Sequence, residues 1–184
     1  MNPSSPPAPK LGTVTAVTIT TPDLESSLAF YRRLGFSELF RADFPFPWIQ
    51  ITDGALLLML RKDNDPYIAL TYYAKDAEKI AAELEAGGIT FEQKAKPSDF
   101  IKRFLFRSPD GLNISIVTLA DGFHQPAGPT LLNMPPADYF SPEKYPNKSC
   151  GLFGEFAHPV KDIEASIAFW QKLGFRALSR HESP

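Results

Sequence analysis

The chain has 184 residues, a formal net charge of −2 and 43% hydrophobic residues, which is enough for one globular domain and part of another. This charge gives no basic surface for phosphates, and no apolar run is long enough for a membrane span, so neither nucleic acid nor membrane is expected as a partner. The single cysteine, Cys150, excludes an intramolecular disulfide and favours a reducing, cytoplasmic compartment.

A regular pattern begins after residues 1–10, a Pro- and Ser-rich stretch that we expect to be a disordered tail without the apolar core of a signal peptide. Asp23 is placed to N-cap a helix, and Gly35 is placed to end it in a left-handed conformation. The apolar residues of this helix recur at helical spacing: Leu24, Leu28, Tyr31 and Leu34. Strand-like runs occupy 14–20, 36–41, 48–52 and 55–61. The order is therefore βαβββ.

A more diverged unit of the same kind follows directly. Asp76 is placed to cap a helix over 77–86, and Gly87-Gly88 ends it. Strands are predicted at 67–73, 89–93, 102–106 and 113–118, with a tight turn at Ser108-Pro109-Asp110-Gly111 before the last. Residues 11–121 thus form a complete two-unit module. Residues 122–150 contain six prolines and read as an extended connector.

The helix of the first unit recurs near the end of the chain. Asp162–Phe175 reads DIEASIAFWQKLGF against DLESSLAFYRRLGF at Asp23–Phe36, with eight of fourteen positions identical. Such self-similarity indicates that one supersecondary unit is used again, after an extended run at 152–156. Residues 151–184 therefore read as the start of a second module. Because this third unit lacks its later strands, we expect the natural chain to continue beyond Pro184, or another chain to complete it.

Paired βαβββ units with this helix motif and a P-D-G hairpin resemble the glyoxalase/bleomycin resistance/dioxygenase group, the vicinal oxygen chelate superfamily. The resemblance implies an α+β fold in which the tandem units form a cupped mixed sheet, followed here by a partial third unit. It also implies that enzymatic members hold a divalent metal inside the cup, and that the bleomycin-resistance branch binds its ligands without metal, usually as homodimers.

The resemblance places metal ligands in the first and last strands of each unit. Carried over by their spacing from the capping Asp and the hairpin Gly, the four positions are Ala16, Leu58, Ala69 and Ser115. None is a usual ligand for Zn, Fe or Mn, so no metal is expected in residues 11–121. Glu155 matches Ala16 in the third unit. It could contribute to a divalent metal site in the second module, although a lone carboxylate is more commonly a solvated acid.

Strand alternation gives a provisional lining of the cup. It turns inward a set of aromatic and neutral hydrogen-bonding residues: Thr18, Trp48, Gln50, Tyr73, Asn113 and Ser115. Such a mixture is typical of a small-molecule pocket, although the same side chains could simply fill the cup. Arg103 and Arg107 share one face of the seventh strand, and the sequence leaves open whether that face is the inner one.

These patterns favour a non-catalytic protein that binds or sequesters a small, partly aromatic molecule, forms a homodimer and has no catalytic residue in 11–121. One alternative is a metal-dependent lyase, isomerase or dioxygenase with its site in the incomplete second module. Another is a protein-interaction module whose cup docks a partner.

Overall fold

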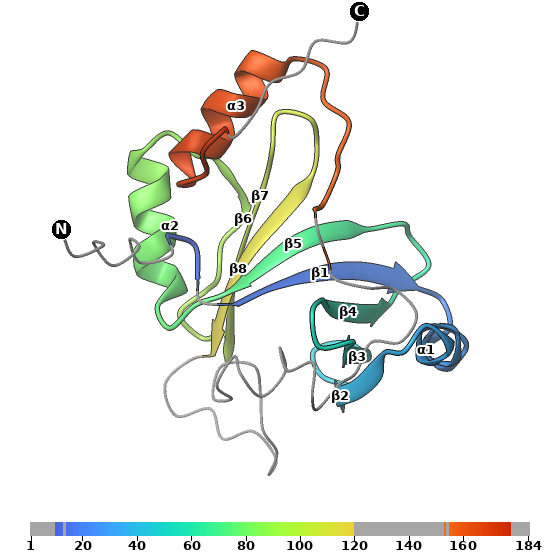
Figure 1. The fold of residues 1–184 in the computed structure, drawn as a ribbon. Helices are drawn as coiled ribbons and strands as arrows, with labels where there is room; N and C mark the ends of the chain where they lie inside the picture. The colour runs from blue at the N-terminus through green and yellow to red at the C-terminus, as the bar shows by residue number, and fades with distance from the viewer. Residues whose placement is uncertain (1–9, 13, 120–152, 154, 178–184) are drawn as a thin grey trace, which may run out of the picture.

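The computed structural model describes residues 10–12, 14–119, 153 and 155–177. Eight strands form one sheet that curls into an open cup, in the order β2-β3-β4-β1-β5-β8-β7-β6 (Figure 1). The strands are β1 (Val14–Thr21), β2 (Ser37–Ala42), β3 (Trp48–Thr52), β4 (Leu57–Lys62), β5 (Ile68–Tyr73), β6 (Phe91–Gln93), β7 (Ile101–Arg107) and β8 (Asn113–Leu119). The helices are α1 (Leu24–Arg33), α2 (Ala77–Ala86) and α3 (Ile163–Lys172).

The order of these elements confirms the predicted α+β fold and its two βαβββ units. The first unit runs β1, α1, β2, β3, β4, and the second runs β5, α2, β6, β7, β8. Within each unit the first strand lies parallel to the last, and the two units join through the antiparallel pair β1–β5. The remaining pairs are antiparallel, so the sheet is mixed.

All three helices begin at the predicted aspartates. The Asp23 carboxylate accepts hydrogen bonds from the backbone N–H groups of Glu25 and Ser26, each at 3.0 Å. Asp162 makes the same two bonds at the start of α3, and Asp76 accepts one from Lys79 at 2.9 Å. These bonds satisfy amide groups that have no acceptor within the helix. The repeated sequence therefore builds the same helix start twice.

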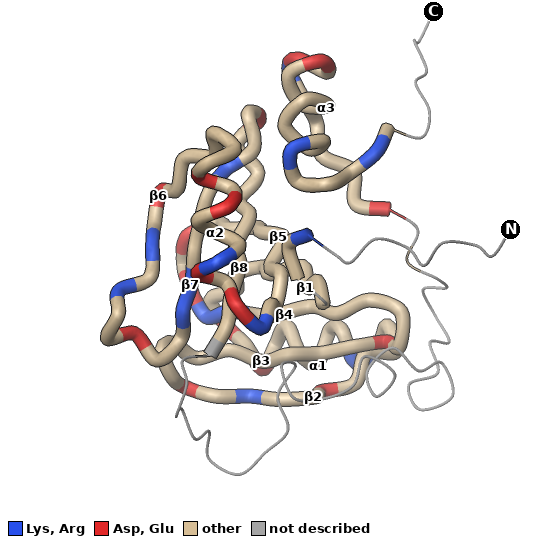
Figure 2. The backbone as a smooth tube through the Cα atoms, turned by 90° about the vertical axis from the view of Figure 1, so that its left-hand side faces the viewer, with Lys and Arg blue, Asp and Glu red and all other residues tan. Residues whose placement is uncertain are grey.

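The two faces of the sheet differ in composition because successive residues of a strand point to opposite sides. The face under α1 and α2, which we call the helix face, carries the apolar core: α1 packs on Val17, Ile49 and Leu60, while α2 packs on Phe106 and Ile116 among others. The opposite side is the concave face. No Lys, Arg, Asp or Glu occurs in β1, β3, β5 or β8, and the charged residues of the sheet lie on β2, β4, β6 and β7 (Figure 2).

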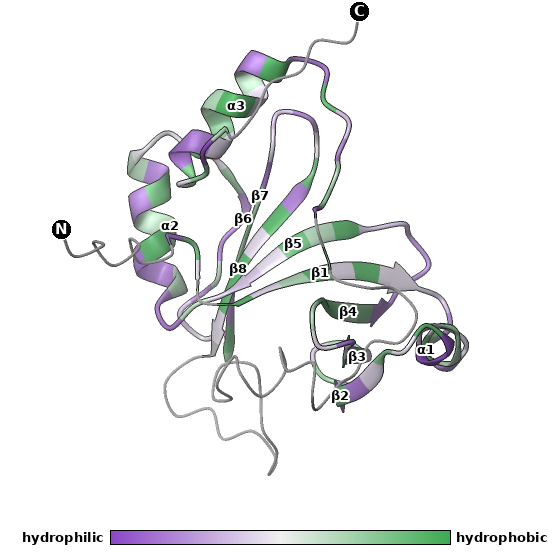
Figure 3. Ribbon diagram, in the orientation of Figure 1, coloured by the Kyte–Doolittle hydropathy of each residue, from purple (hydrophilic) through white to green (hydrophobic). Residues whose placement is uncertain are grey.

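Alternation along a single strand is visible in β1 and β5, where strongly apolar and paler segments follow one another (Figure 3). In β1, Val17 and Ile19 belong to the helix-face core, whereas Ala16 and Thr18 lie on the concave face. The prediction that the first helix presents one apolar face is confirmed. Leu28 is fully buried beneath α1, and the other apolar residues at helical spacing are partly buried against the same core: Leu24, Tyr31 and Leu34.

The third unit contributes a helix but no paired strand among the described residues. Helix α3 packs against the α2 core through Leu173, which is 2% exposed, and through Phe169, whose ring centroid is 6.3 Å from that of Phe106. The predicted extended run at 152–156 forms no strand at 153 or 155–156, the positions that the structure describes. Beside β1, the corresponding strand of the first unit, both neighbouring places are taken by β4 and β5. The predicted tail, apart from Lys10, and the connector at 122–150 lie outside the described residues.

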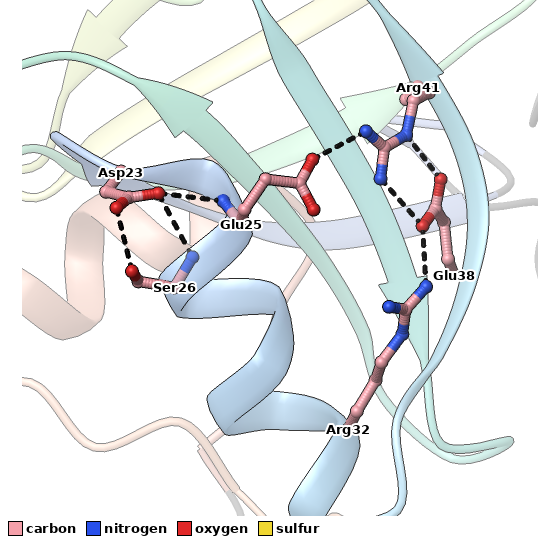
Figure 4. Close-up of polar contacts among 6 residues, drawn as sticks. All are labelled: Asp23, Glu25, Ser26, Arg32, Glu38 and Arg41. Carbon is pink, nitrogen blue, oxygen red and sulfur yellow. Dashed lines mark hydrogen bonds and ion pairs between the residues drawn. The ribbon is translucent and has the colours of Figure 1, made fainter.

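A surface network of charges ties α1 to β2. The Glu38 carboxylate accepts hydrogen bonds from Arg32 at 3.0 Å and from Arg41 at 2.6 and 2.9 Å, and Arg41 also donates to Glu25 at 2.7 Å (Figure 4). These hydrogen bonds from Arg41, followed by its charge and that of Arg32, hold the pKa of Glu38 below its ordinary value. In the described part of the chain no helix is long and apolar enough to cross a membrane.

Candidate functional site

A row of neutral polar side chains crosses five neighbouring strands on the concave face. The row is formed by Gln50, Met59, Thr18, Thr71 and Ser115, from β3, β4, β1, β5 and β8 in that order. The hydroxyl oxygens of Thr18 and Thr71 lie 2.8 Å apart, and those of Thr71 and Ser115 lie 3.0 Å apart. Thr18 also donates to the sulfur of Met59 at 3.7 Å. We refer to these five residues as the central row.

Tyr73 closes the row at the end formed by Gln50. Its hydroxyl accepts a hydrogen bond from Gln50 Nε2 at 3.2 Å and donates to the sulfur of Met59 at 3.8 Å. Burial raises the pKa of Tyr73 to about 12, and the hydrogen bond from Gln50 and the positive charge of Arg103 act in the opposite direction. The phenol is therefore a neutral hydrogen-bonding group at physiological pH.

Four of the six predicted lining residues meet in this arrangement: Thr18, Gln50, Tyr73 and Ser115. The other two, Trp48 and Asn113, bond elsewhere. Trp48 donates its indole N–H to the carbonyl of Phe44 at 3.2 Å, and Asn113 donates to the carbonyl of Ile68 at 3.0 Å. The concave face thus has a bonded centre, with Trp48 and Asn113 outside the hydrogen-bonded row.

Among the four positions that the resemblance assigns to metal ligands, Ala16 and Ala69 are buried on the concave face opposite Thr71 and Thr18. Ser115 belongs to the central row. Leu58 is different: it lies on the helix face, in the cluster of Val17 and Leu28. The residue of β4 that lies beside Thr18 on the concave face is Met59, so the position taken from the sequence is wrong by one residue.

The error comes from the two hairpins, which differ in length. The β3–β4 turn leaves four residues between the paired Thr52 and Leu57, and the β7–β8 turn leaves five between Arg107 and Asn113. Gly54 therefore stands three residues before its strand and Gly111 only two before its own. Because side chains alternate, the same count from each glycine reaches opposite faces of the sheet.

The central row does not fit a bound metal ion. Its donors are an amide, three hydroxyls and a thioether, whereas Zn, Fe and Mn sites in proteins are built from carboxylates, imidazoles and thiolates. Within the described ranges, no three His, Cys, Asp or Glu side chains come together in a metal-binding arrangement. Glu155 lies exposed in the segment that precedes α3.

Two surface hollows lie away from the central row. One, of about 500 Å³, is lined by residues at the start of α1 and the ends of β2 and β4, including Glu25, Arg41 and Lys62. The other, of about 350 Å³, lies between α3 and the β7–β8 turn and is lined by Pro109 and Phe169 among others. Neither brings together groups with an evident chemical task.

The sequence matches the model of the Glyoxalase/Bleomycin resistance protein/Dioxygenase superfamily over residues 13–116, more than half of the chain. No curated protein matches it. Homoprotocatechuate 2,3-dioxygenase from Arthrobacter globiformis is similar in structure, with a TM-score of 0.55 and 20% identity, over 94% of this chain and 52% of that one. A catechol 2,3-dioxygenase gives 0.51 and 16% identity over 89% and 54%. The chain spans about half the length of both, and at these identities the likeness shows the fold alone.

Proposed function

The chain belongs to the glyoxalase/bleomycin resistance protein/dioxygenase superfamily, and on that premise we propose that its two-unit module binds a small, partly aromatic molecule on the concave face without transforming it. The observation that carries the proposal is the central row, in which neutral groups bond to one another where the resemblance expects metal ligands. A surface of neutral hydrogen-bonding groups can bind a ligand although it carries no group that would react with it.

The central row lacks the groups that catalysis requires. A general acid or base is most effective when its pKa lies near the working pH, and Tyr73 is far above it with a pKa of about 12. The hydroxyls of Thr18, Thr71 and Ser115 bond to one another and to the sulfur of Met59, and no imidazole or carboxylate of the described residues bonds to them to activate them as nucleophiles. The donor set of amide, hydroxyl and thioether groups does not fit a metal ion that could assist a reaction.

The same face has the makeup of a small-molecule site. Such sites combine apolar and aromatic surface with a few placed polar groups. Here the half-buried Met59, Tyr67 and Tyr73 supply polarizable surface, while Thr18 and Ser115 supply hydroxyls beneath it. A thioether adapts to the edge of an aromatic ring, which suits Met59 to a planar ligand.

A matched pair of variants tests the proposal. Planar aromatic molecules are titrated into ¹⁵N-labelled protein, and amide shifts are expected in β1, β4, β5 and β8 around the central row. Met59→Phe, which enlarges a residue on the concave face, is expected to weaken binding at least about tenfold, a change of about 1.4 kcal/mol. Ile80→Phe enlarges a partly buried residue in α2 on the helix face and is expected to leave affinity unchanged.

Shifts that cluster around α2, or equal losses in the two variants, would place the ligand elsewhere and refute binding on the concave face. Thermal unfolding of each variant without ligand controls for loss of folded protein.

Two alternatives predict different results. If Glu155 ligates a metal in the second module, the protein binds stoichiometric Fe, Mn, Ni or Zn and loses it on Glu155→Ala. If the concave face docks a protein, the aromatic probes leave the amides of the central row unshifted, and a partner protects these amides from hydrogen exchange. A homodimer is proposed on the resemblance alone, and sedimentation analysis tests it.

A further inference from the structure

The register of β7 resolves which way its arginines point. Arg103 pairs with Val117, and Leu105 pairs with Ser115 of the central row, so Arg103 and Leu105 lie on the concave face. The alternate residues, Phe104 among them, are buried in the helix-face core. A guanidinium group is therefore directed toward the side of the sheet that carries the central row.

Two tyrosines are affected by Arg103: Tyr67, in the turn before β5, and Tyr73, at the end of β5. The Nη2 of Arg103 donates to the Tyr67 hydroxyl at 2.8 Å, and its Cζ lies 5.9 Å from the centroid of the Tyr67 ring. Its charge also lowers the pKa of Tyr73, against the larger effect of burial. Arg103 is thus held against Tyr67 at the rim of the concave face.

Arg103 differs from the other arginines of this face in having no carboxylate partner among the described residues. Arg61 pairs with Asp63 at 2.8 Å and Arg107 pairs with Glu92 at 3.1 Å. Arg103 is half-buried, and among the described residues its hydrogen bond goes to the Tyr67 hydroxyl rather than to a carboxylate. A guanidinium has five N–H donors, so most of its capacity to bind an anion is unused.

The surroundings of Arg103 are aromatic. Tyr67 is approached by a second guanidinium, that of Arg61, with Cζ 5.6 Å from the ring centroid, and Arg61 also lies 4.3 Å from the centroid of Phe46. These contacts hold the Tyr67 ring beside Arg103. The flat ring of Tyr67 and the guanidinium of Arg103, which has no carboxylate partner among the described residues, therefore lie side by side at the rim of the concave face.

We propose that Arg103 is the anion-recognising residue of the concave face and that its ligand is an aromatic carboxylate. The inference rests on the proposed function and names the chemical class of its ligand. A carboxylate matches the guanidinium fork in charge and shape, and one cation balances one carboxylate, whereas a phosphate dianion would need a second cation.

A pair of probes of equal shape and different charge tests the proposal: 2-naphthoate and 2-naphthamide. Calorimetric titration is expected to show naphthoate binding more tightly than naphthamide, with an affinity that falls as salt is raised. Arg103→Gln is expected to weaken naphthoate about tenfold to hundredfold, which is the usual worth of a hydrogen bond to a charged group, and to leave naphthamide unchanged. Arg103→Lys is expected to restore part of the preference for the anion.

Arg107→Gln is the matched control, because Arg107 lies on the same strand and face but is exposed and already paired with Glu92. Thermal unfolding shows whether each variant is folded. If both probes bind equally well, or Arg107→Gln has the larger effect, the role of Arg103 is refuted while binding on the concave face stands. If neither probe binds, the proposed function fails, and the role of Arg103 fails with it.

Discussion

The two faces of the curled sheet are made by the same strands and are held together differently. On the helix face, β1 contributes Val17 to a continuous apolar core under α1. One residue further, Thr18 belongs to a row of hydroxyls that satisfy one another. Burial of apolar area is non-directional, whereas a hydrogen-bonded row depends on each partner being present. The larger apolar clusters lie on the helix face, whereas the concave face combines a smaller apolar cluster with the hydrogen-bonded row.

The largest difference between the faces is expected on truncating a core aromatic. Phe106 is fully buried, with its ring centroid 5.2 Å from that of Phe91, and Phe106→Ala should lower the free energy of unfolding by about 3–5 kcal/mol. Met59→Ala on the concave face should cost less, because Met59 is only half-buried. Urea unfolding of both variants measures the contrast. A cost for Met59→Ala equal to that for Phe106→Ala would contradict the division between the faces.

A smaller effect, of a different kind, is expected within the central row. Thr71→Val removes the shared partner of Thr18 and Ser115, so the buried Ser115 hydroxyl loses its bond to Thr71 and Thr18 keeps only the weak bond to the sulfur of Met59, which should cost about 1–3 kcal/mol. Replacing all three residues by apolar ones of similar shape should cost no more than the single change, because no hydroxyl is then stranded. Additive losses across the series, measured by chemical unfolding, would show that the row is not a coupled unit.

Alkaline titration compares the faces through two adjacent tyrosines. Burial raises the pKa of both Tyr72, in the helix-face core, and Tyr73, on the concave face, to about 12. In the unfolded chain both ionise near their ordinary value of about 10, so the unfolded state loses protons first. Stability should therefore be complete below pH 10 and fall as the pH rises from about 10 to 12.

Ultraviolet absorbance should show Tyr72 and Tyr73 ionising late, with Tyr31, whose pKa burial also raises, ionising above the ordinary range as well. Gln50→Leu removes a hydrogen bond that lowers the pKa of Tyr73, so it should delay that group further and leave Tyr72 unchanged. A shift of both tyrosines in Gln50→Leu would mean that the faces are not electrostatically separate.

The sequence predicted the helix face better than the concave face, for a physical reason. Asp23 and Gly35 act locally, and the spacing around Leu28 defines one side of a helix whatever lies beneath it. These features could be assigned without knowing the partner strands. The repeat extended the same assignment to Asp162, where the cap forms as predicted.

The concave face depends on register, which the sequence did not settle. The two hairpin turns differ in length by one residue, so the spacing rule selected Leu58 where Met59 lies on the concave face. The face on which Arg103 lies became known only from its pairing with Val117. Pairing also bears on the third unit, where the described residues of the run predicted as extended, 153, 155 and 156, form no strand. A comparison of the lengths of the two hairpin turns in the sequence could have identified Met59 as the residue of β4 on the concave face.

The smallest effect is expected at the charge network between α1 and β2, which lies at the exposed edge of the helix face, outside the apolar core (Figure 4). Glu38→Gln removes the carboxylate shared by Arg32 and Arg41 and should lower the free energy of unfolding by less than about 1 kcal/mol, because its partners are about half-exposed. The pKa of Glu38 is lowered by folding, so its contribution is present at neutral pH and lost as the pH falls through that lowered pKa. Chemical unfolding of both proteins at neutral and acidic pH, in low and high salt, measures this difference. It should vanish in acid and shrink in high salt, whereas the cost of Phe106→Ala should persist in both, because salt and protons act on charges and not on apolar packing.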